Sequence, residues 1–201
     1  MKTIKTSVPF STKHPIVDVE ISNDISSDWD SSKGEISVAG FLVDNEITQF
    51  LLINKSKLGE FRNQINDFLS TVTEKQLYAF NIKMETGCFE KLLSKSLVFR
   101  EIKPKNFRAK GFNKDYCFGY LIKQDIISKD FIWFEDPLKG NGRLCMNCWS
   151  AGEFEKVRLH NVCCLLKEAK ILQHKDFLEK QLSPFFKEDG WLKDGVSLPP
   201  L

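Results

Sequence analysis

Alternating apolar and polar residues mark several short stretches of the chain as strands. In residues 15–21, β-branched side chains alternate with acidic ones, a pattern typical of a β-strand. Residues 35–43 and 47–53 follow as two more strands. Three strands joined by polar connections, the first of which covers residues 22–33, predict an antiparallel meander. Shorter apolar runs predict further strands over residues 76–81, 97–102 and 131–134.

Elsewhere, apolar residues recur every three or four positions, which predicts helices. This pattern covers residues 57–72 and 84–94, and it returns from about residue 154 to residue 181. The order of elements is therefore three strands, a helix, a strand, a helix, one or two strands and finally helices. A meander followed by strand–helix–strand units predicts an α/β fold in which helices cover both faces of one mixed sheet.

The length of the chain fits one domain that covers residues 1–201. Apolar residues make up 42% and charged residues 28% of the chain, a balance that supports a sizeable core and excludes a disordered or fibrous protein. Three stretches show little periodicity, and we expect them to be a loose leader, an insertion and an irregular tail. They cover residues 1–13, 103–130 and 184–201, respectively.

The sequence predicts a cytoplasmic protein without a membrane partner. Its longest apolar runs, such as residues 50–53, are far too short to cross a bilayer. The basic N-terminus is not followed by the apolar stretch of a secretory signal. We therefore expect the six cysteines to be reduced thiols and not a disulfide framework.

A formal net charge of +2 argues against a protein that grips nucleic acid over its whole surface, but it allows a local basic groove. Basic residues bind phosphates and aromatic rings stack on bases, so a stretch that interleaves the two suits single-stranded DNA or RNA. A solvated loop in a lysine-rich protein is the alternative, and the sequence leaves both open. The stretch consists of Lys103, Lys105, Phe107, Arg108, Lys110, Phe112 and Lys114.

Two acidic residues of the first predicted meander strand are the strongest chemical signal. Asp18 and Glu20 point to the same side, because strand side chains repeat with period two. Carboxylates among buried apolar residues are costly without a partner, and Mg²⁺ or Mn²⁺ is a suitable partner because hard cations prefer oxygen ligands. An exposed edge strand would carry the same pair. Asn81 and Glu85 follow another predicted strand, at the end where α/β sheets place their ligands.

The order of these residues resembles that of the DEDD-type 3′–5′ exonucleases of the ribonuclease H-like superfamily. Asp18 and Glu20 match the first family motif, an Asp-x-Glu on a strand. Asn81 and Glu85 match the second motif, with glutamate in place of aspartate. His160 matches the tyrosine or histidine of the third motif, which lies on a helix. The resemblance covers most of the domain and implies a ribonuclease H-like mixed sheet, an antiparallel meander plus parallel strands, flanked by helices.

The chain departs from the family pattern in two of the three motifs. Met84 stands where the second motif has an aromatic residue. In the third motif the expected aspartate is replaced by Cys164 or Leu165, neither of which is a hard oxygen ligand. Glu168 lies one turn after Cys164 on the same helix face and can supply the missing carboxylate. Asp136, at the end of a predicted strand, is another candidate.

The resemblance implies a metal-dependent 3′–5′ exonuclease that acts on single-stranded DNA or RNA ends. Two Mg²⁺ or Mn²⁺ ions held by Asp18, Glu20 and Glu85 would activate a water for in-line attack on the terminal phosphodiester. His160 would act as the general base or orient the attacking water, and Glu168 would supply the missing carboxylate. Loss of one carboxylate would weaken activity or leave one metal position empty. The expected substrate-binding residues are Asn81, Lys103, Lys105 and Arg108.

Two alternatives stay open. One is a catalytically degenerate domain that binds nucleic acid or a protein partner without cleavage. The other is a zinc-stabilised interaction domain, in which Cys145 and Cys148, at zinc-knuckle spacing, join His160 and either Cys163 or Cys164. Such a site would take His160 out of catalysis. Cysteines beside leucines in a helix also serve as small buried apolar residues, which is the competing interpretation.

Overall fold

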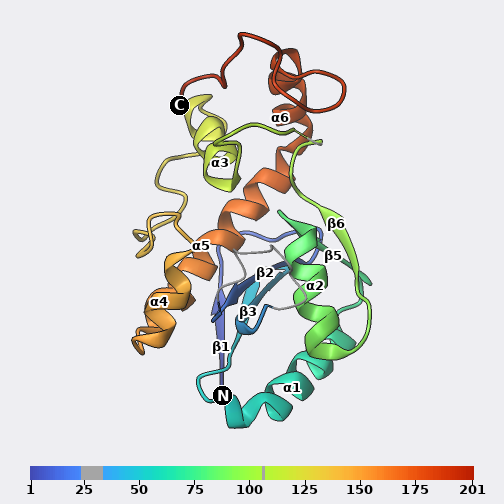
Figure 1. Cartoon of the computed structure of the whole chain (residues 1–201), viewed down its shortest axis with the longest axis vertical. Coiled ribbons are helices and arrows are strands. Elements are labelled where there is room, and N and C mark those ends of the chain that lie inside the picture. The colour runs from blue at the N-terminus through green and yellow to red at the C-terminus, as the bar shows by residue number, and fades with distance from the viewer. Residues whose placement is uncertain (24–33, 106) are drawn as a thin grey trace.

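The computed structural model describes residues 1–23, 34–105 and 107–201 (Figure 1). The predicted connection over residues 22–33 lies largely outside the described residues. The strands are β1 (Lys2–Ser7), β2 (Ile16–Ile21), β3 (Ile36–Val43), β4 (Glu46–Leu51), β5 (Gln76–Ala79) and β6 (Val98–Glu101). They form one sheet of order β1-β4-β3-β2-β5-β6. Neighbours from β1 to β2 in this order are antiparallel, whereas β2 pairs with β5 and β5 with β6 in parallel.

Helices cover both faces of this sheet. Figure 1 shows α5 running across the sheet, with α1 and α2 together on its other side. A mixed sheet with antiparallel and parallel pairs and flanking helices confirms the predicted fold class, a ribonuclease H-like layout. The helices are α1 (Leu58–Thr71), α2 (Ile82–Leu93), α3 (Lys114–Lys123), α4 (Leu144–Ser150), α5 (Phe154–Gln173) and α6 (Lys175–Leu182).

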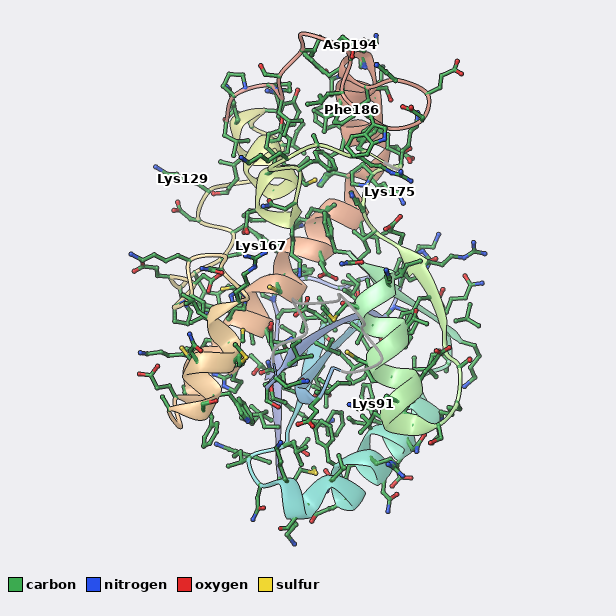
Figure 2. All side chains as sticks on the ribbon, viewed as in Figure 1. Lys91, Lys129, Lys167, Lys175, Phe186 and Asp194 are labelled. Atoms are coloured by element: carbon green, nitrogen blue, oxygen red, sulfur yellow. The ribbon has the colours of Figure 1, made fainter. Side chains whose placement is uncertain are left out.

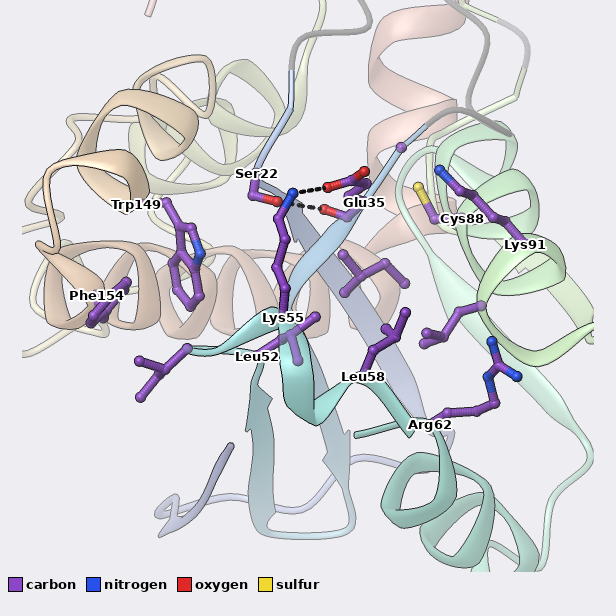
Figure 3. Close-up of a pocket in the computed structure, with 14 residues that line it drawn as sticks. Ser22, Glu35, Leu52, Lys55, Leu58, Arg62, Cys88, Lys91, Trp149 and Phe154 are labelled. Atoms are coloured by element: carbon purple, nitrogen blue, oxygen red, sulfur yellow. Dashed lines mark hydrogen bonds and ion pairs between the residues drawn. The ribbon is translucent and has the colours of Figure 1, made fainter. Parts of the chain in front are cut away.

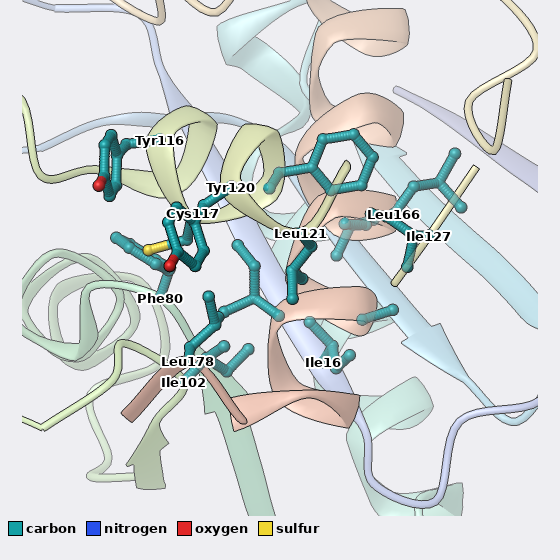
Figure 4. Packing of buried hydrophobic residues seen from close by; sticks show 14 of the residues in the cluster. Ile16, Phe80, Ile102, Tyr116, Cys117, Tyr120, Leu121, Ile127, Leu166 and Leu178 are labelled. Atoms are coloured by element: carbon teal, nitrogen blue, oxygen red, sulfur yellow. The ribbon is translucent and has the colours of Figure 1, made fainter. Parts of the chain in front are cut away.

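The alternation along β2 divides the core between the two faces. Ile16 packs in one buried cluster with Leu166 of α5 (Figure 4). Val17 and Val19 belong to a second cluster, which includes Phe89 of α2. Because side chains alternate along a strand, the two acidic residues of β2 face α5. The sheet therefore directs them to the side on which the long helix lies.

The N-terminal residues do not form the loose leader that the sequence predicted. Lys2–Ser7 form β1, which pairs in register with Glu46–Leu51 of β4. Most side chains of β1 are exposed or half-buried, as expected at the edge of a sheet. An edge strand offers unpaired backbone groups to a neighbour, so this pairing needs no marked apolar pattern in the added strand.

The predicted strand over residues 131–134 is wrong, because these residues form bends and irregular backbone. Phe131, Ile132 and Phe134 are partly buried against the same cluster that covers α5, so their apolar character reflects packing. A short apolar run alone does not distinguish a strand from another segment that packs against the core. The single helix predicted over residues 154–181 is divided into α5 and α6, and α4 was not predicted at all.

The predicted insertion over residues 103–130 contains α3, which is part of the core. Cys117 and Leu121 of α3 are fully buried in the cluster shared with α5 (Figure 4). The C-terminal tail is largely irregular, as predicted, with only a short 3-10 turn and isolated bridges. Figure 2 shows Phe186 and Asp194 at the end of the long axis formed by this tail and α6.

Candidate functional site

One pocket of about 500 Å³ collects most of the predicted site residues. It lies between β2, the start of α2, the start of α3 and the middle of α5. The pocket is lined by all the residues predicted to bind metal or to catalyse, namely Asp18, Glu20, Glu85, His160 and Glu168, and by two predicted substrate-binding residues, Asn81 and Lys103.

A second hollow of about 410 Å³ holds none of these residues (Figure 3). Apolar side chains such as Leu52, Leu58 and Trp149 line much of it. Its Lys55 Nζ lies 2.7 Å from Glu35 Oε2, so these two charges pair with each other. Of these two hollows, only the first therefore holds the residues predicted to bind metal or to catalyse.

Four carboxylates of the first pocket are withdrawn from solvent. The exposed fractions are 6% for Asp18, 7% for Glu20, 4% for Glu85 and 0% for Glu168. Carboxylates at this depth are costly unless they are protonated, paired with a cation or bound to a metal. Confirming the geometry expected from the strand pattern, Asp18 and Glu20 face the same side.

Lys114, the first residue of α3, reaches into this group. Its Nζ lies 2.7 Å from Asp18 Oδ1 and 2.5 Å from Glu168 Oε1. Asn113 caps the helix by accepting a hydrogen bond from the backbone N–H of Tyr116 at 2.9 Å. A lysine in the first turn of a helix is unfavourable, because its positive charge lies near the positive end of the helix dipole. The ion pairs with the two carboxylates offset this cost.

Lys114 does not affect the pKa values of the surrounding carboxylates equally. Burial acts to raise the pKa of Asp18, but the Lys114 ammonium outweighs it and holds that pKa below its usual value. Burial raises the pKa of Glu168 well above its usual value despite the same lysine. Burial, with the charge of Asp18 next in size, raises the pKa of both Glu20 and Glu85 to about 8. The single ammonium of Lys114 therefore does not offset the cost of burying four carboxylates.

Two oxygen atoms of this group lack a partner. Glu85 Oε2 and Glu168 Oε2 are buried and have no hydrogen-bond partner among the described residues. Buried polar atoms in folded proteins are nearly always paired, so these oxygens point to a bound proton or cation. Oxygen ligands at negatively charged sites are those that Mg²⁺ and Mn²⁺ prefer. The unpartnered oxygens fit a hard divalent cation one by one. In the described part of the chain, however, neither Glu85 nor Glu168 belongs to a group of three ligand atoms within 4.8 Å of one another, so the predicted metal ligands Asp18, Glu20 and Glu85 share the pocket without meeting at one point.

His160 is held from behind by a carboxylate. Its Nδ1 lies 2.9 Å from Asp136 Oδ1, and Asp136 itself accepts hydrogen bonds from the backbone N–H groups of Leu138 and Gly140. Burial acts to lower the pKa of His160, but the hydrogen bond with Asp136 and nearby carboxylates raise it on balance. Asp136 thus orients the histidine, whereas Glu168 lines the pocket as the additional carboxylate.

Cys164 takes the place of the aspartate expected in the third motif. It lines the pocket, and its sulfur, with one oxygen each from Asp18 and Glu20, forms a group of atoms within 4.8 Å of one another. Leu165, the other candidate position, is fully buried in the core. The site therefore has a sulfur at one of the two positions for which the sequence resemblance predicted a carboxylate.

Asn161 is a positioning residue that the sequence analysis missed. It is fully buried, and its Nδ2 donates to Asp18 Oδ2 at 2.8 Å and to the Asp18 carbonyl at 3.0 Å. Its Oδ1 accepts from Gln49 Nε2 at 2.8 Å. A Cβ added to Gly40 of β3 would lie 2.0 Å from Asn161 Oδ1. A glycine inside a strand is the available sequence signal, because it often marks a close approach.

The zinc knuckle considered from the sequence is not formed as predicted. Cys145 Sγ donates a hydrogen bond to Glu20 Oε2 at 3.0 Å, and Cys145 clusters with Glu20 and His160. Neither Cys148 nor Cys163 belongs to a group of three close metal-ligating atoms in the described part of the chain. Cys145 and Cys148 both lie on α4, where only the buried side of the helix faces β2.

The basic stretch divides between the pocket and the far end of the molecule. Lys103 lines the pocket, whereas Lys105 and Arg108 lie outside it, and their role in substrate binding stays a prediction. Lys105 Nζ donates to Ser183 Oγ at 3.2 Å, and the Arg108 guanidinium lies over the Trp191 ring at 5.9 Å. The two phenylalanines of the stretch are buried. Lys105 and Arg108 therefore contact the C-terminal part of the chain and not the pocket.

Comparisons of the chain with protein-family models, with curated proteins and with solved structures found no match. No helix in the described ranges is long and apolar enough to cross a membrane.

Proposed function

We propose that this protein is a divalent-cation-dependent phosphodiesterase that removes nucleotides from the 3′ ends of single-stranded DNA or RNA. The observation that carries the proposal is the convergence of four buried carboxylates on one pocket, with unpartnered oxygens on Glu85 and Glu168. Mg²⁺ or Mn²⁺ held by these carboxylates would supply Lewis-acid activation of the phosphodiester and lower the pKa of a bound water.

The chain's own residues would position and deprotonate the reactants. Asn161 and Lys114 hold Asp18 in place from two sides. His160 Nδ1 is hydrogen-bonded to Asp136. The other ring nitrogen, Nε2, faces Glu20 and lies 4.0 Å from its Oε1. In that orientation, His160 Nε2 can accept a proton from an attacking water.

The size of the pocket favours a chain end over a duplex. A volume of about 500 Å³ falls within the range of small-molecule sites and suits a terminal nucleotide. Asn81 and Lys103 lie on its wall, where an amide and an ammonium can bind the sugar and phosphate of the adjoining nucleotide. Phe112 also lines the pocket, where an aromatic ring can contact a base.

Cleavage of labelled strands tests the proposal. Purified protein is incubated with 5′-labelled single-stranded DNA and RNA in Mg²⁺ or Mn²⁺, and progressive shortening from the 3′ end is expected. Asp18→Asn should lower the rate by at least about 100-fold, because metal-assisted steps contribute several kcal/mol. Glu60→Gln, on the exposed side of α1, is the matched control and should cleave normally. No shortening by the wild-type protein would refute the proposal.

One observation favours a second function, binding of single strands without cleavage. Lys114 already pairs with Asp18 and Glu168, so a fixed cation stands where the carboxylates would otherwise meet a metal. This function predicts salt-sensitive binding that survives Asp18→Asn and weakens in Lys103→Gln. Filter binding at several salt concentrations, run beside the cleavage assay, separates the two functions. Binding without shortening selects the second.

A further inference from the structure

A second group of metal-ligating side chains lies at the edge of the same pocket, with two members on its wall and a third, Cys145, buried behind it. Ligand atoms of Glu20, Cys145 and His160 all lie within 4.8 Å of one another, and all three residues are buried. Cys145 Sγ lies 3.0 Å from Glu20 Oε2, and His160 Nε2 lies 4.0 Å from Glu20 Oε1. The three residues come from three different elements, β2, α4 and α5. Packing of the whole domain is therefore needed to bring them together.

We propose that Glu20, Cys145 and His160 bind one zinc ion, which inhibits the cleavage reaction proposed above. The inhibition rests on that proposed function, whereas the binding does not. Zinc takes thiolate, imidazole and carboxylate ligands in tetrahedral geometry. A thiolate is a poor ligand for Mg²⁺ or Mn²⁺, so this donor set differs in selectivity from the neighbouring carboxylates.

His160 is oriented as ligating histidines are in zinc sites. Its Nδ1 is bound to Asp136, which is fixed in turn by two backbone N–H groups. A carboxylate behind a histidine sets the tautomer and the direction of the ring, so that the other nitrogen faces the metal. His160 Nε2 lies 3.7 Å from Cys164 Sγ, a weak hydrogen bond to sulfur, and an ion bound at Nε2 would replace this contact.

The site has a route of entry and an open position. Glu20 and His160 line the pocket, whereas Cys145 is 1% exposed and contacts Glu20 with its thiol. An ion that enters from the pocket meets the carboxylate and the imidazole first. Its binding displaces the Cys145 thiol proton to solvent. Three protein ligands leave a fourth position toward the pocket for a water.

Zinc at this site would remove two groups from the cleavage reaction. His160 Nε2 cannot accept a proton from water while it ligates zinc. Glu20 would have its oxygens drawn toward the zinc and away from the carboxylates around Asp18. Zinc is therefore expected to compete with the Mg²⁺- or Mn²⁺-supported reaction without replacing its metal.

Cobalt substitution tests the binding directly. Metal-free, reduced protein is titrated with Co²⁺, and a thiolate-to-cobalt charge-transfer band is expected to saturate at one ion per chain and to disappear when zinc is added. Cys145→Ser should abolish the band. Cys148→Ser, three residues further along the same helix and outside the cluster, is the matched control and should keep it. No band in the wild type, or a band that survives in Cys145→Ser, overturns the proposal.

Two further measurements keep the test decisive if Cys145→Ser does not fold. X-ray absorption of the wild-type protein with one equivalent of zinc should show one sulfur at about 2.3 Å and lighter ligands at about 2.0–2.1 Å. A shell without sulfur overturns the proposal. Asp136→Asn should keep the sulfur ligand but weaken zinc binding by about 10–100-fold, as loss of a carboxylate behind a ligating histidine does.

The inhibition has its own assay. In the manganese-supported cleavage reaction, one equivalent of zinc should slow the wild-type protein, and Cys145→Ser should no longer respond to zinc. If zinc binds with a sulfur ligand and cleavage continues unchanged, the inhibition is refuted. If the wild-type protein cleaves nothing under any condition, the proposed function fails, while the cobalt spectrum still decides the zinc site.

Discussion

Replacing Glu85 by glutamine should alter how the stability of the metal-free protein depends on pH. Glu85 is 4% exposed, and one of its carboxylate oxygens has no partner among the described residues. Burial, followed by the charge of Asp18, raises its pKa from 4.5 to about 8. Glutamine keeps nearly the same shape and removes the ionisation. The substitution therefore isolates the free-energy cost of the buried charge.

The sign follows from proton binding. A carboxylic acid with a raised pKa in the folded state holds its proton more tightly there than in the unfolded chain, so unfolding releases a proton. The stability that it contributes is fully present below pH 4.5 and is lost as pH rises toward about 8. Glu20, with a pKa also raised to about 8, acts in the same direction. The wild-type protein should thus lose stability across this window.

The magnitude comes from the same pKa. Each pH unit between the unfolded and folded pKa values corresponds to about 1.4 kcal/mol, so Glu85 accounts for up to about 4 kcal/mol between pH 5 and pH 8. At pH 5 the glutamine variant should be less stable than the wild type by about 1–3 kcal/mol, because it buries an amide without good partners. At pH 8 the order should reverse, as the variant escapes the ionisation cost.

Urea unfolding followed by circular dichroism, in the presence of a chelator at several pH values, measures this difference. Glu60→Gln, at an exposed position of α1, is the control, and its order of stability relative to the wild type should not reverse between pH 5 and pH 8. Manganese should stabilise the wild type more than Glu85→Gln at pH 8, because the variant lacks one ligand. A gap between Glu85→Gln and the wild type that does not change with pH would refute the reasoning.

Three further changes test how the site is built. Asn161→Ala removes the amide that holds Asp18 and should cost about 2–4 kcal/mol of unfolding free energy and weaken manganese binding, read by urea unfolding and by a manganese titration. Gly40→Ala places a Cβ 2.0 Å from Asn161 Oδ1 and should destabilise the fold by about 1–3 kcal/mol, whereas Gly59→Ala, which meets nothing within 4 Å in helix α1, should raise the melting temperature slightly. Lys114→Met leaves two buried carboxylates unpaired and should cost about 3–5 kcal/mol in the metal-free protein. Manganese should then raise the melting temperature of Lys114→Met more than that of the wild type, since it can replace the missing ammonium between the carboxylates. An equal rise in both proteins in a calorimetric melt would contradict the view that Lys114 and the metal share the same carboxylates.

The sequence by itself determined the meander strands β2, β3 and β4 and the helices α1 and α2, but not β1, α3 or α4. It also determined where the carboxylates of the site lie on their own elements. Period-two alternation in β2 fixed Asp18 and Glu20 on one face, because successive side chains of a strand must point to opposite sides. The position of Glu85 just after β5 placed it at the carboxyl end of a parallel strand. Glu168 was expected on the face of His160 from helical spacing alone, and both line the pocket. These are properties of neighbours in the chain.

Only the tertiary structure decided which distant residues complete the site. Lys114 meets Asp18 across 96 residues and Cys145 meets Glu20 across 125 residues, and neither contact leaves a local pattern. Lys105 and Arg108 looked equivalent to Lys103 in the sequence, but packing against the C-terminal tail draws them to the far end of the molecule. Local periodicity determines the direction in which a side chain points. The partner that the side chain contacts depends on how the helices pack over the sheet.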